Sequence, residues 1–445
     1  MKSLVWILAG MSILAAAAGS ARAESTIWAP PSLKALIDEG LAQNREIQSQ
    51  AVRVESLQAE IDFAGSLEDP MLGFGVLNLP TDTFDFDQEP MTQKQVSISQ
   101  KFPWFGKLDL RSQRAALQAI RANALLNEQK LFLAQQIADA YYQIGFVEQS
   151  LRINDRLSET ISRLLGEAET RYATGKGLQQ DVLQAQVELS MLVDERITLE
   201  RRRRSLEDRI LALLNRGTQQ RISEATTPPE PDFELELEPL RGIALNRNPA
   251  LQVRQAEIDI TETDIELARK AYWPDMDVRL AYGQRDEDFT GRDLPDFFSA
   301  QVVINLPVWQ KTRQDSRLKS SLKNRLAAEK SYRNLTESLP HQVDALVNEI
   351  TRLKRNYRFY GQALILQAEH WAQSALVAYE VGKLEFDSMI SAQIRLLRFH
   401  LQKQDYLFQI YRKRAELEAL LGGPLPAVGS EGVEPAAKEP EKLNR

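Results

Sequence analysis

Few side chains in this 445-residue sequence could carry out chemistry. It contains no cysteine, which excludes disulfides, thiolate metal sites, cysteine catalysis and a lipid-modified N-terminal cysteine. His341, His370 and His400 are scattered, without the spacing that metal ligation requires. Met71 and Met91 could be soft copper ligands, but packing is the favoured interpretation. Phosphate-binding loops, nucleophile elbows and paired-carboxylate motifs are also absent, so we predict no enzyme, no cofactor and no metal site.

The charge balance and the N-terminus indicate an exported protein. With 55 basic and 62 acidic residues, the net charge of −7 gives no reason to expect nucleic acid. Lys2, an apolar run from Leu4 to Ala18 and the small-x-small motif Ala21-Arg22-Ala23 predict a signal peptide over residues 1–23. The run is shorter than the roughly 20 residues of a spanning helix, and no other segment approaches that length. Such a chain can cross a membrane only as a β-barrel.

The chain contains two copies of one unit. At an offset of 204 residues, Asn44 aligns with Asn248 and Pro103 with Pro307. Further on, at an offset of 207, RYATGKGLQQDVLQAQ (171–186) aligns with AYEVGKLEFDSMISAQ (378–393). We therefore predict five segments, which are a signal peptide (1–23), a first repeat (24–225), an acidic Pro-rich connector (226–238), a second repeat (239–422) and a disordered tail (423–445).

Each copy should begin with a helical stretch, at about 32–66 and 239–270, followed by two strands. The strands are expected near 71–79, 93–102, 275–285 and 297–306, where apolar and polar residues alternate. In the last of these, Val302 would lie on an apolar face and Gln301 on a polar one. An ordinary sheet on a core and a membrane barrel both fit this pattern. Four strands cannot close a barrel, since the smallest have about eight, so a barrel would require two or three chains.

Long helices should fill the rest of each copy. The stretch from Gly106 to Tyr172 lacks proline and would span roughly 100 Å as one helix. In the second copy, Pro340 predicts a kink or break. The next helix of each copy has a coiled-coil seam with a cation at the same place, Arg196 and Lys403, which favours a register device or an interhelical ion pair.

Export, the repeat, the four strands and the long helices together resemble the TolC-type outer-membrane efflux channels. The likeness covers about Ser32 to Gly422, and its specific parts are FPWFGK (102–107), LPVWQK (306–311) and the two aligned tip segments. It implies a mainly α fold with a small transmembrane β part, a homotrimer in the outer membrane lipid, and a large periplasmic portion. It also implies a periplasmic adaptor and an inner-membrane pump of the RND type. DPMLGFG (69–75) and SISQKFPWFGK (97–107) are most similar to the heavy-metal branch.

The resemblance also implies roles for individual residues. Gate candidates near the two tips are Asp181, Asp387, Ser388 and Ser391, the serines standing at the family's usual aspartate positions. Adaptor-contact candidates are Gly175, Lys176, Gly382 and Lys383. The barrel-to-tunnel junction would comprise Pro103, Trp104, Phe105, Pro307 and Trp309. Pro suits this place because it ends the strand ladder and its fixed φ can start a helix.

A second hypothesis is a periplasmic coiled-coil adaptor or structural protein without a membrane barrel. It would explain the heptads and the signal peptide, but it leaves the duplicated alternating strands without a purpose. The first hypothesis, an exit duct that passively conducts substrates from a pump, metal cations among them, accounts for both features.

Overall fold

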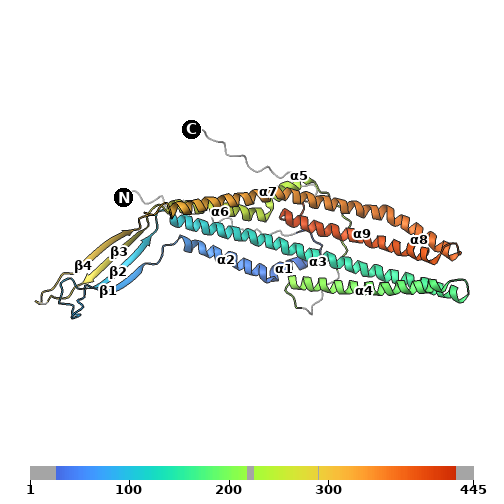
Figure 1. Ribbon diagram of the computed structural model, residues 1–445, viewed down its shortest axis with the longest axis horizontal. Coiled ribbons are helices and arrows are strands. Elements are labelled where there is room, and N and C mark those ends of the chain that lie inside the picture. The colour runs from blue at the N-terminus through green and yellow to red at the C-terminus, as the bar shows by residue number, and fades with distance from the viewer. Residues whose placement is uncertain (1–26, 218–224, 289, 427–445) are drawn as a thin grey trace, which may run out of the picture. The chain divides into compact units, whose positions relative to one another are not determined.

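The computed structural model describes residues 27–217, 225–288 and 290–426. They form two units, each built from segments that are far apart in the chain (Figure 1). The sheet unit comprises Ser49–Asn127 and Pro249–Glu337. The helical unit comprises Met1–Gln48, Glu128–Asn248 and Ser338–Arg445. The predicted signal peptide and most of the predicted tail lie outside the described residues.

The sheet unit contains one antiparallel sheet whose strand order is the chain order. Its strands are β1 (Met71–Leu77), β2 (Gln93–Phe102), β3 (Met276–Gln284) and β4 (Phe297–Ile304). They run side by side, with both hairpin loops at the end of the sheet away from the helices of this unit (Figure 1). The predicted strands are therefore confirmed, with ends that differ by at most two residues. Because β1 and β4 each pair on one side only, both outer edges of the sheet are open.

The strand register gathers the apolar side chains on one face of the sheet. Leu72 lies opposite Ile98, Ile98 opposite Leu280, and Leu280 opposite Ala300. Side chains on this face are largely exposed in the single chain, with Phe74 at 76% and Val302 at 63%. The predicted faces are confirmed, and the apolar one has no protein cover of its own.

Each copy begins with two helices rather than the single stretch expected. They are α1 (Pro31–Gln43) and α2 (Arg45–Gly65) in the first copy, and α5 (Leu237–Arg247) and α6 (Pro249–Lys270) in the second. The breaks fall at Asn44 and Asn248, whose side-chain amides donate to the carbonyls of Leu213 (2.9 Å) and Leu420 (2.8 Å). Each asparagine thereby fixes its break to the end of the last long helix of the same copy.

The long helices are α3 (Lys107–Ala173), α4 (Gln179–Leu213), α7 (Gln314–Phe359), α8 (Ile365–Glu380) and α9 (Phe386–Leu421). A short π-helical segment, η1 (Tyr360–Leu364), joins α7 to α8. Of the kink or break predicted at Pro340, a break is ruled out, because α7 continues through this residue. Leu339 and Val343 beside it are fully buried, and this packing outweighs the one backbone hydrogen bond that proline removes. Within the described ranges, no helix combines the length and the apolar character needed to cross a membrane.

Candidate functional site: the hairpin tips and the strand-to-helix junction

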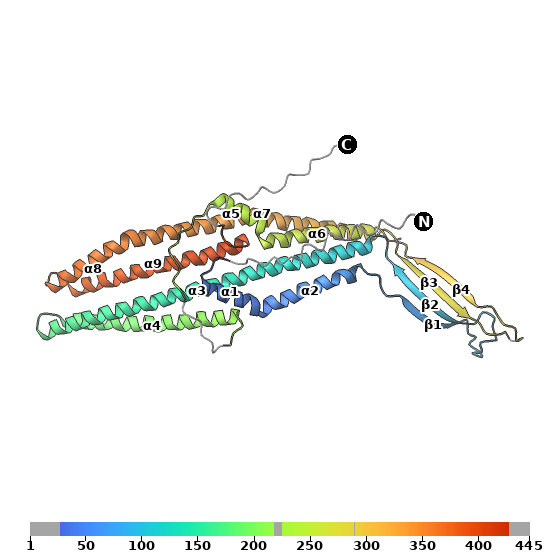
Figure 2. The same ribbon diagram turned by 180° about the vertical axis from the view of Figure 1, so that it is seen from behind.

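The helical unit ends in two helical hairpins with the same turn. One joins α3 to α4 and the other α8 to α9, and they lie at the same end of the unit (Figure 2). Gly175 and Gly382 have positive φ values of 73° and 71°, a conformation that glycine adopts without strain. Lys176 and Lys383 follow, and their amides close the helix ends on Arg171 and Ala378, each at 2.8 Å. The predicted adaptor-contact residues thus form two equivalent, exposed turns.

The two hairpins contact each other directly. The Arg171 guanidinium lies 4.6 Å from the centre of the Tyr379 ring and donates to the Tyr379 carbonyl at 2.9 Å. Below this contact, Tyr379 packs edge-on against Phe386, in a buried apolar cluster shared by α3, α4, α8 and α9. Burial raises the pKa of the Tyr379 hydroxyl, the positive charge of Arg171 opposes the rise, and the negative charge of Asp181 adds to it. Asp181 therefore belongs to this contact region.

The predicted gate residues all lie at the starts of α4 and α9. Asp181 is partly buried in the first turn of α4, and Asp387 occupies the first turn of α9. The side chain of Gln184 donates to Asp387 at 2.6 Å, which links the first tip to the second. Ser388 and Ser391 are exposed on α9. An acid in the first turn is also favoured by the helix dipole, so its position alone does not assign a gate.

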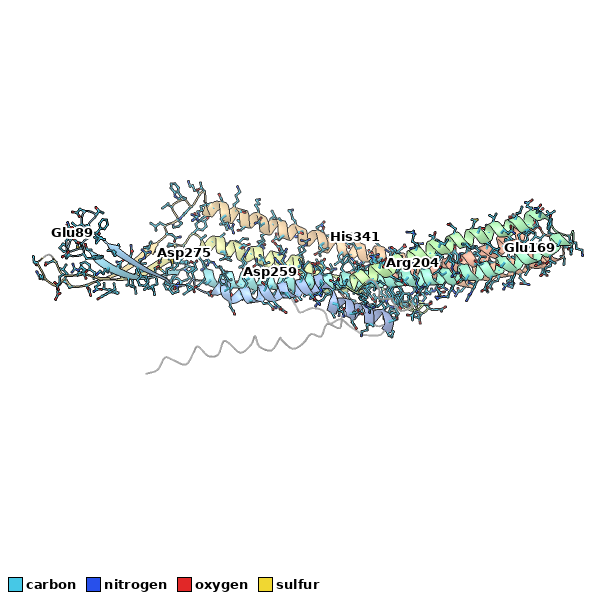
Figure 3. The ribbon with its side chains drawn as sticks, turned by 90° about the horizontal axis from the view of Figure 1, so that it is seen from below. Glu89, Glu169, Arg204, Asp259, Asp275 and His341 are labelled. Carbon is cyan, nitrogen blue, oxygen red and sulfur yellow. The ribbon has the colours of Figure 1, made fainter. Side chains whose placement is uncertain are left out.

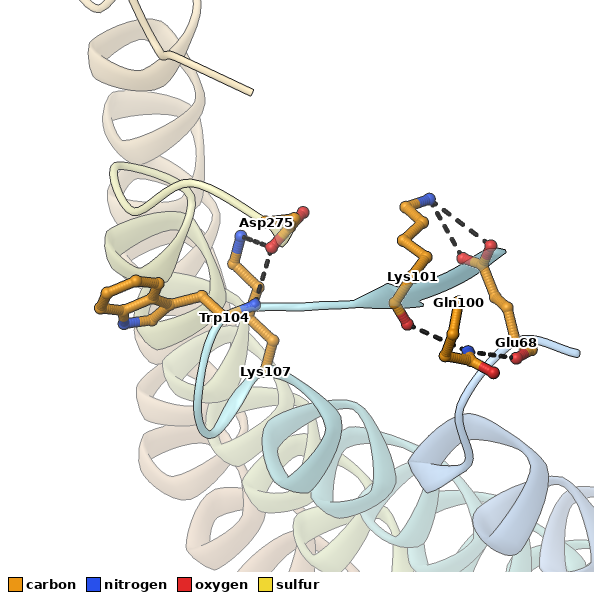
Figure 4. A network of polar contacts seen from close by, with 6 residues as sticks. All are labelled: Glu68, Gln100, Lys101, Trp104, Lys107 and Asp275. Carbon is orange, nitrogen blue, oxygen red and sulfur yellow. Dashed lines mark hydrogen bonds and ion pairs between the residues drawn. The ribbon is translucent and has the colours of Figure 1, made fainter. Parts of the chain in front are cut away.

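The junction of β2 with α3 is held by one carboxylate. Asp275, just before β3, accepts from the Trp104 amide at 2.8 Å and from the Lys107 ammonium at 2.7 Å (Figure 4). Lys107, only 8% exposed, also donates to the Trp273 carbonyl at 3.2 Å. Burial raises the pKa of Asp275. The hydrogen bonds from the Lys107 ammonium and the Trp104 amide, together with the charges of Lys107 and Arg111, outweigh burial and hold this pKa below its usual range.

Trp104 and Phe105 follow β2 at this junction, and Trp309 follows β4 at the corresponding place in the second copy; their role at a membrane interface stays a prediction. Trp104 stacks on Trp273, with ring centres 4.9 Å apart and planes 11° from parallel. Phe105 and Trp309 are 73% and 74% exposed. Pro103 directly follows β2, as expected. In the second copy, by contrast, a series of turns separates Pro307 from the start of α7 at Gln314.

Four residues of these sites were missed by sequence reasoning. Arg171 and Tyr379 lie within the aligned tip segments, but nothing in their spacing indicates that they meet. Asp275 and Trp273 flank Pro274, which aligns with Pro70, and a charged residue between a proline and a strand was the available signal. The second copy therefore supplies partners for residues of the first, and only the folded chain shows which ones.

The described residues include no group of three or more His, Cys, Asp or Glu side chains arranged to hold a metal ion. His341 lies on α7 (Figure 3). There the hydrogen bond from Arg241 lowers the pKa of Asp344, and the charge of His341 contributes to the lowering. Acidic residues of the β1–β2 loop, such as Glu89, are exposed at the far end of the sheet unit (Figure 3). Their side chains are available to solvent or to a partner.

Comparison with known proteins identifies one family. The model of the family described as outer membrane efflux protein matches residues 36–216 and again 240–423. The cobalt-zinc-cadmium resistance protein CzcC of Cupriavidus metallidurans is 21% identical, over 88% of this chain and 90% of its own length. The pyoverdine export outer membrane protein OpmQ of Pseudomonas putida is also 21% identical, over 64% of this chain and 63% of its own length.

Solved structures share the fold. The outer-membrane channel OprN superposes with a TM-score of 0.75 at 17% identity, covering 88% of this chain and 90% of its own. CusC gives 0.75 at 16% identity, with coverage of 89% and 94%. The outer membrane protein VceC of Vibrio cholerae gives 0.73 at 18% identity, with coverage of 88% and 96%. The predicted fold class, mainly α with a small β part, is confirmed.

Proposed function

We propose a function from the premise that this chain belongs to the outer membrane efflux protein family. It is accordingly an efflux channel of the outer membrane with a large periplasmic helical portion, and a passive conductor rather than an enzyme. The finer proposal is that it forms the exit duct of a tripartite system. In that system an inner-membrane pump, of the RND type, supplies the energy, and a periplasmic adaptor joins the pump to the duct.

The duct would be a homotrimer. Each chain offers only four strands, with an exposed apolar face and two open edges, β1 and β4. Unpaired backbone groups at such edges are not tolerated in lipid, so the sheet must be completed by other copies. Three copies would provide twelve strands, within the range of known outer-membrane barrels.

The hairpin tips are the proposed end of the duct that meets the pump assembly. Gly175, Lys176, Gly382 and Lys383 form exposed turns with open space around both glycines, which supports contact with an adaptor. Asp181 and Asp387 are proposed to narrow the opening, repeated in each copy. Several carboxylates close together attract cations and repel anions.

We propose divalent metal cations as the cargo. The observation that carries this proposal is the similarity to the cobalt-zinc-cadmium resistance protein, which extends over nearly all of both chains. The pyoverdine export protein matches a smaller share of the chain. Acidic tip residues support the same cargo, because they would favour cations over anionic compounds.

Deleting the gene and measuring growth on cobalt, zinc and cadmium tests this cargo. We expect the deletion strain to become sensitive to at least one of these cations, and the wild-type gene to restore tolerance. Siderophore secretion is measured in the same strains as the matched control. Unchanged tolerance to all three cations together with lost siderophore secretion would show that the cargo is wrong, although the channel would still stand.

A further inference from the structure

The open edges of the sheet pose a specific question, which is how β4 of one copy pairs with β1 of the next. The internal repeat supplies an answer, because β2 aligns with β4 and β3 with β1 at the offset of 204 residues. The contact between β2 and β3 inside one chain is therefore the repeat equivalent of a contact between β4 and the β1 of another copy. Its register is known from the structure.

We propose that β4 pairs with β1 of a neighbouring copy in the register of β2 with β3. In the chain, Gln100 lies opposite Val278 and Ile98 opposite Leu280. Transferred through the repeat, Ile304 would lie opposite Phe74 of the next copy, and Val302 opposite Val76. The inference rests on the proposed trimeric channel, and it adds the residue-by-residue pairing at the closing edge.

This register keeps like residues together. Ile304, Phe74, Val302 and Val76 all lie on the apolar face, with exposed fractions between 46% and 76% in the single chain. A slip of one residue would place apolar side chains opposite polar ones, so only slips of two can compete. Slips of two deserve consideration because the two hairpins themselves differ by two residues. Leu72 pairs with Ile98, whereas Met276, the repeat equivalent of Leu72, pairs with Ile304 and not with Val302, the equivalent of Ile98.

The tilt of the closed sheet provides a physical check. The row that starts at Leu72 passes through Ile98, Leu280 and Ala300, and would reach Asn78 of the next copy, six residues along β1. With a rise of about 3.3 Å per residue, the six-residue displacements of three copies add up to about 59 Å along the strands. With about 4.8 Å between neighbouring strands, twelve strands extend about 58 Å around the barrel. The strands would then tilt by about 45°, at the upper end of the range for outer-membrane barrels.

Slips of two residues change this tilt in opposite directions. A slip that brings Ile304 opposite Val76 raises it to about 54°, outside the known range of about 35–45°. A slip that brings Ile304 opposite Leu72 lowers it to about 35°, which remains possible. The repeat decides between the two remaining registers, and it favours Phe74.

Charges at the junction support the same neighbour. Within the chain, Lys107 donates to the Trp273 carbonyl and to the Asp275 carboxylate. The repeat equivalent of Lys107 is Lys311, and those of Trp273 and Asp275 are Asp69 and Met71. Lys311 and Asp69 are both exposed, and neither makes an ion pair or side-chain hydrogen bond within the described part of the chain. The carboxylate of Asp69 therefore takes the place of the Trp273 carbonyl, and the proposed register brings Lys311 of one copy toward Asp69 of the next.

Cysteine crosslinking tests the register without background, because the chain has no cysteine of its own. Ile304→Cys is combined in turn with Leu72→Cys, Phe74→Cys and Val76→Cys, and membranes are oxidised before non-reducing gel electrophoresis. Directly opposite residues have Cβ atoms about 4.5–5.5 Å apart and diagonal ones about 7–8 Å, so only the opposite pair suits a disulfide. A second pair, Val303→Cys with Gly75→Cys, samples the neighbouring position, where an added Cβ meets no atom within 4 Å.

The expected result is covalent dimers and trimers with Phe74→Cys, several-fold more than with either alternative, and the same products with Val303→Cys and Gly75→Cys. Ile98→Cys with Leu280→Cys, opposite each other within the chain, controls for oxidation of lipid-facing thiols. Native mass spectrometry of each variant reports the oligomer separately. A trimer that crosslinks best through Leu72→Cys or Val76→Cys, or through none of them, overturns the register and leaves the channel intact. Absence of any trimer overturns the proposed duct as well.

Discussion

The two copies of the repeat end their last long helix at the same place by different means. In the first copy, Asn215 has a φ of 52°, and its side chain donates to the Gln43 carbonyl at 3.2 Å. In the second, Gly422 has a φ of 82° and the backbone approaches directly, so that a Cβ there would lie 2.5 Å from the Arg247 carbonyl oxygen. Gln43 and Arg247 are themselves repeat equivalents. In the first copy the Asn215 side chain joins the two segments, whereas in the second copy the two backbones lie in direct contact.

The charged residues at the two helix ends also differ between the copies. Beside Asn215, Arg216 forms an ion pair with Glu39, and both side chains are 23% exposed. Beside Gly422, the fully buried Glu418 accepts from Arg414 at 2.9 Å and from the Trp28 amide at 2.6 Å. Partly exposed polar contacts hold the end of α4, whereas close packing around one buried acid holds the end of α9. A duplicated fold therefore keeps its geometry while its two halves come to depend on different interactions.

Exchanging the two helix-end residues should have the largest effect. Gly422→Asn forces a side chain against the Arg247 carbonyl, and we expect a loss of about 2 kcal/mol or more, as for other overpacked sites. Asn215→Gly removes one hydrogen bond at a position that glycine tolerates, so about 1 kcal/mol or less should be lost. Thermal dissociation of the purified protein in detergent measures both. Equal losses would show that the two helix ends do not differ in packing.

The two tips should differ in their effect on conduction. Asp181 is partly buried and close to the hairpin contact, whereas Asp387 is exposed and already bonded to Gln184. We expect Asp181→Asn, in every copy, to reduce cation selectivity and block by multivalent cations in planar bilayers, and Asp387→Asn to have a smaller effect of the same sign. Glu195→Gln, which neutralises an exposed acid farther along α4, is the matched control. If Asp181→Asn leaves selectivity and block unchanged, Asp181 is not part of the gate.

Stability should depend on pH with opposite signs at the two helix ends. The hydrogen bond from Arg216 lowers the pKa of Glu39, so its stabilisation is present above the unfolded value of about 4.3 and is lost as the pH falls through the folded value. Burial raises the pKa of Glu418, which Arg414 only partly offsets. Its contribution is therefore complete below about 4.3 and is lost as the pH rises through the folded value.

Hydrogen exchange, corrected for intrinsic rates, can separate the two ends. Acidification should reduce protection in the last turn of α4 and increase it in the last turn of α9. Glu39→Gln should abolish the first change and Glu418→Gln the second. Changes of the same sign at both ends would contradict the opposite pKa directions from which this expectation follows.

Local sequence signals recovered the parts of this fold that depend on short-range order. Alternation over β2 and β4, ended by Pro103 and Pro307, placed the strands because period two and a missing amide are visible in the sequence itself. The breaks at Asn44 and Asn248 were within reach, since Asn44 caps α2 and Pro249 begins α6.

Long-range contacts could not be recovered in the same way. Arg171 with Tyr379, and Lys107 with Asp275, join residues more than 160 positions apart, and neither pair has a repeat counterpart to indicate it. Pro340 does not break α7, because its cost is local, whereas the burial of Leu339 and Val343 depends on the whole helical unit. Among the described residues, the π-helical segment η1 occurs only in the second copy, and the sequence offered no signal for it beyond Gly361.

The cations in the coiled-coil seams should show the smallest difference. Arg196 bridges to Asp155 on α3 at 2.5 Å and to Glu200 at 3.1 Å, which confirms the predicted interhelical ion pair in the first copy. Lys403 lies instead 5.0 Å from the centre of the Tyr357 ring, beside Gly361, where an added Cβ would be 3.0 Å from its ammonium nitrogen. In the second copy an aromatic ring thus takes the place of the carboxylate.

Substitution of each seam cation by methionine, an unbranched and uncharged side chain, separates these two environments. Arg196→Met should cost under about 1 kcal/mol, because its pair is about half exposed, and the cost should shrink further at about 1 M salt. Lys403→Met loses a contact worth about 0.5–1 kcal/mol, and part of that is regained by burying the thioether against Tyr357. Its effect on thermal dissociation should therefore be close to zero and independent of salt. A salt-dependent loss for Lys403→Met as large as that for Arg196→Met would mean that the second seam also contains an ion pair.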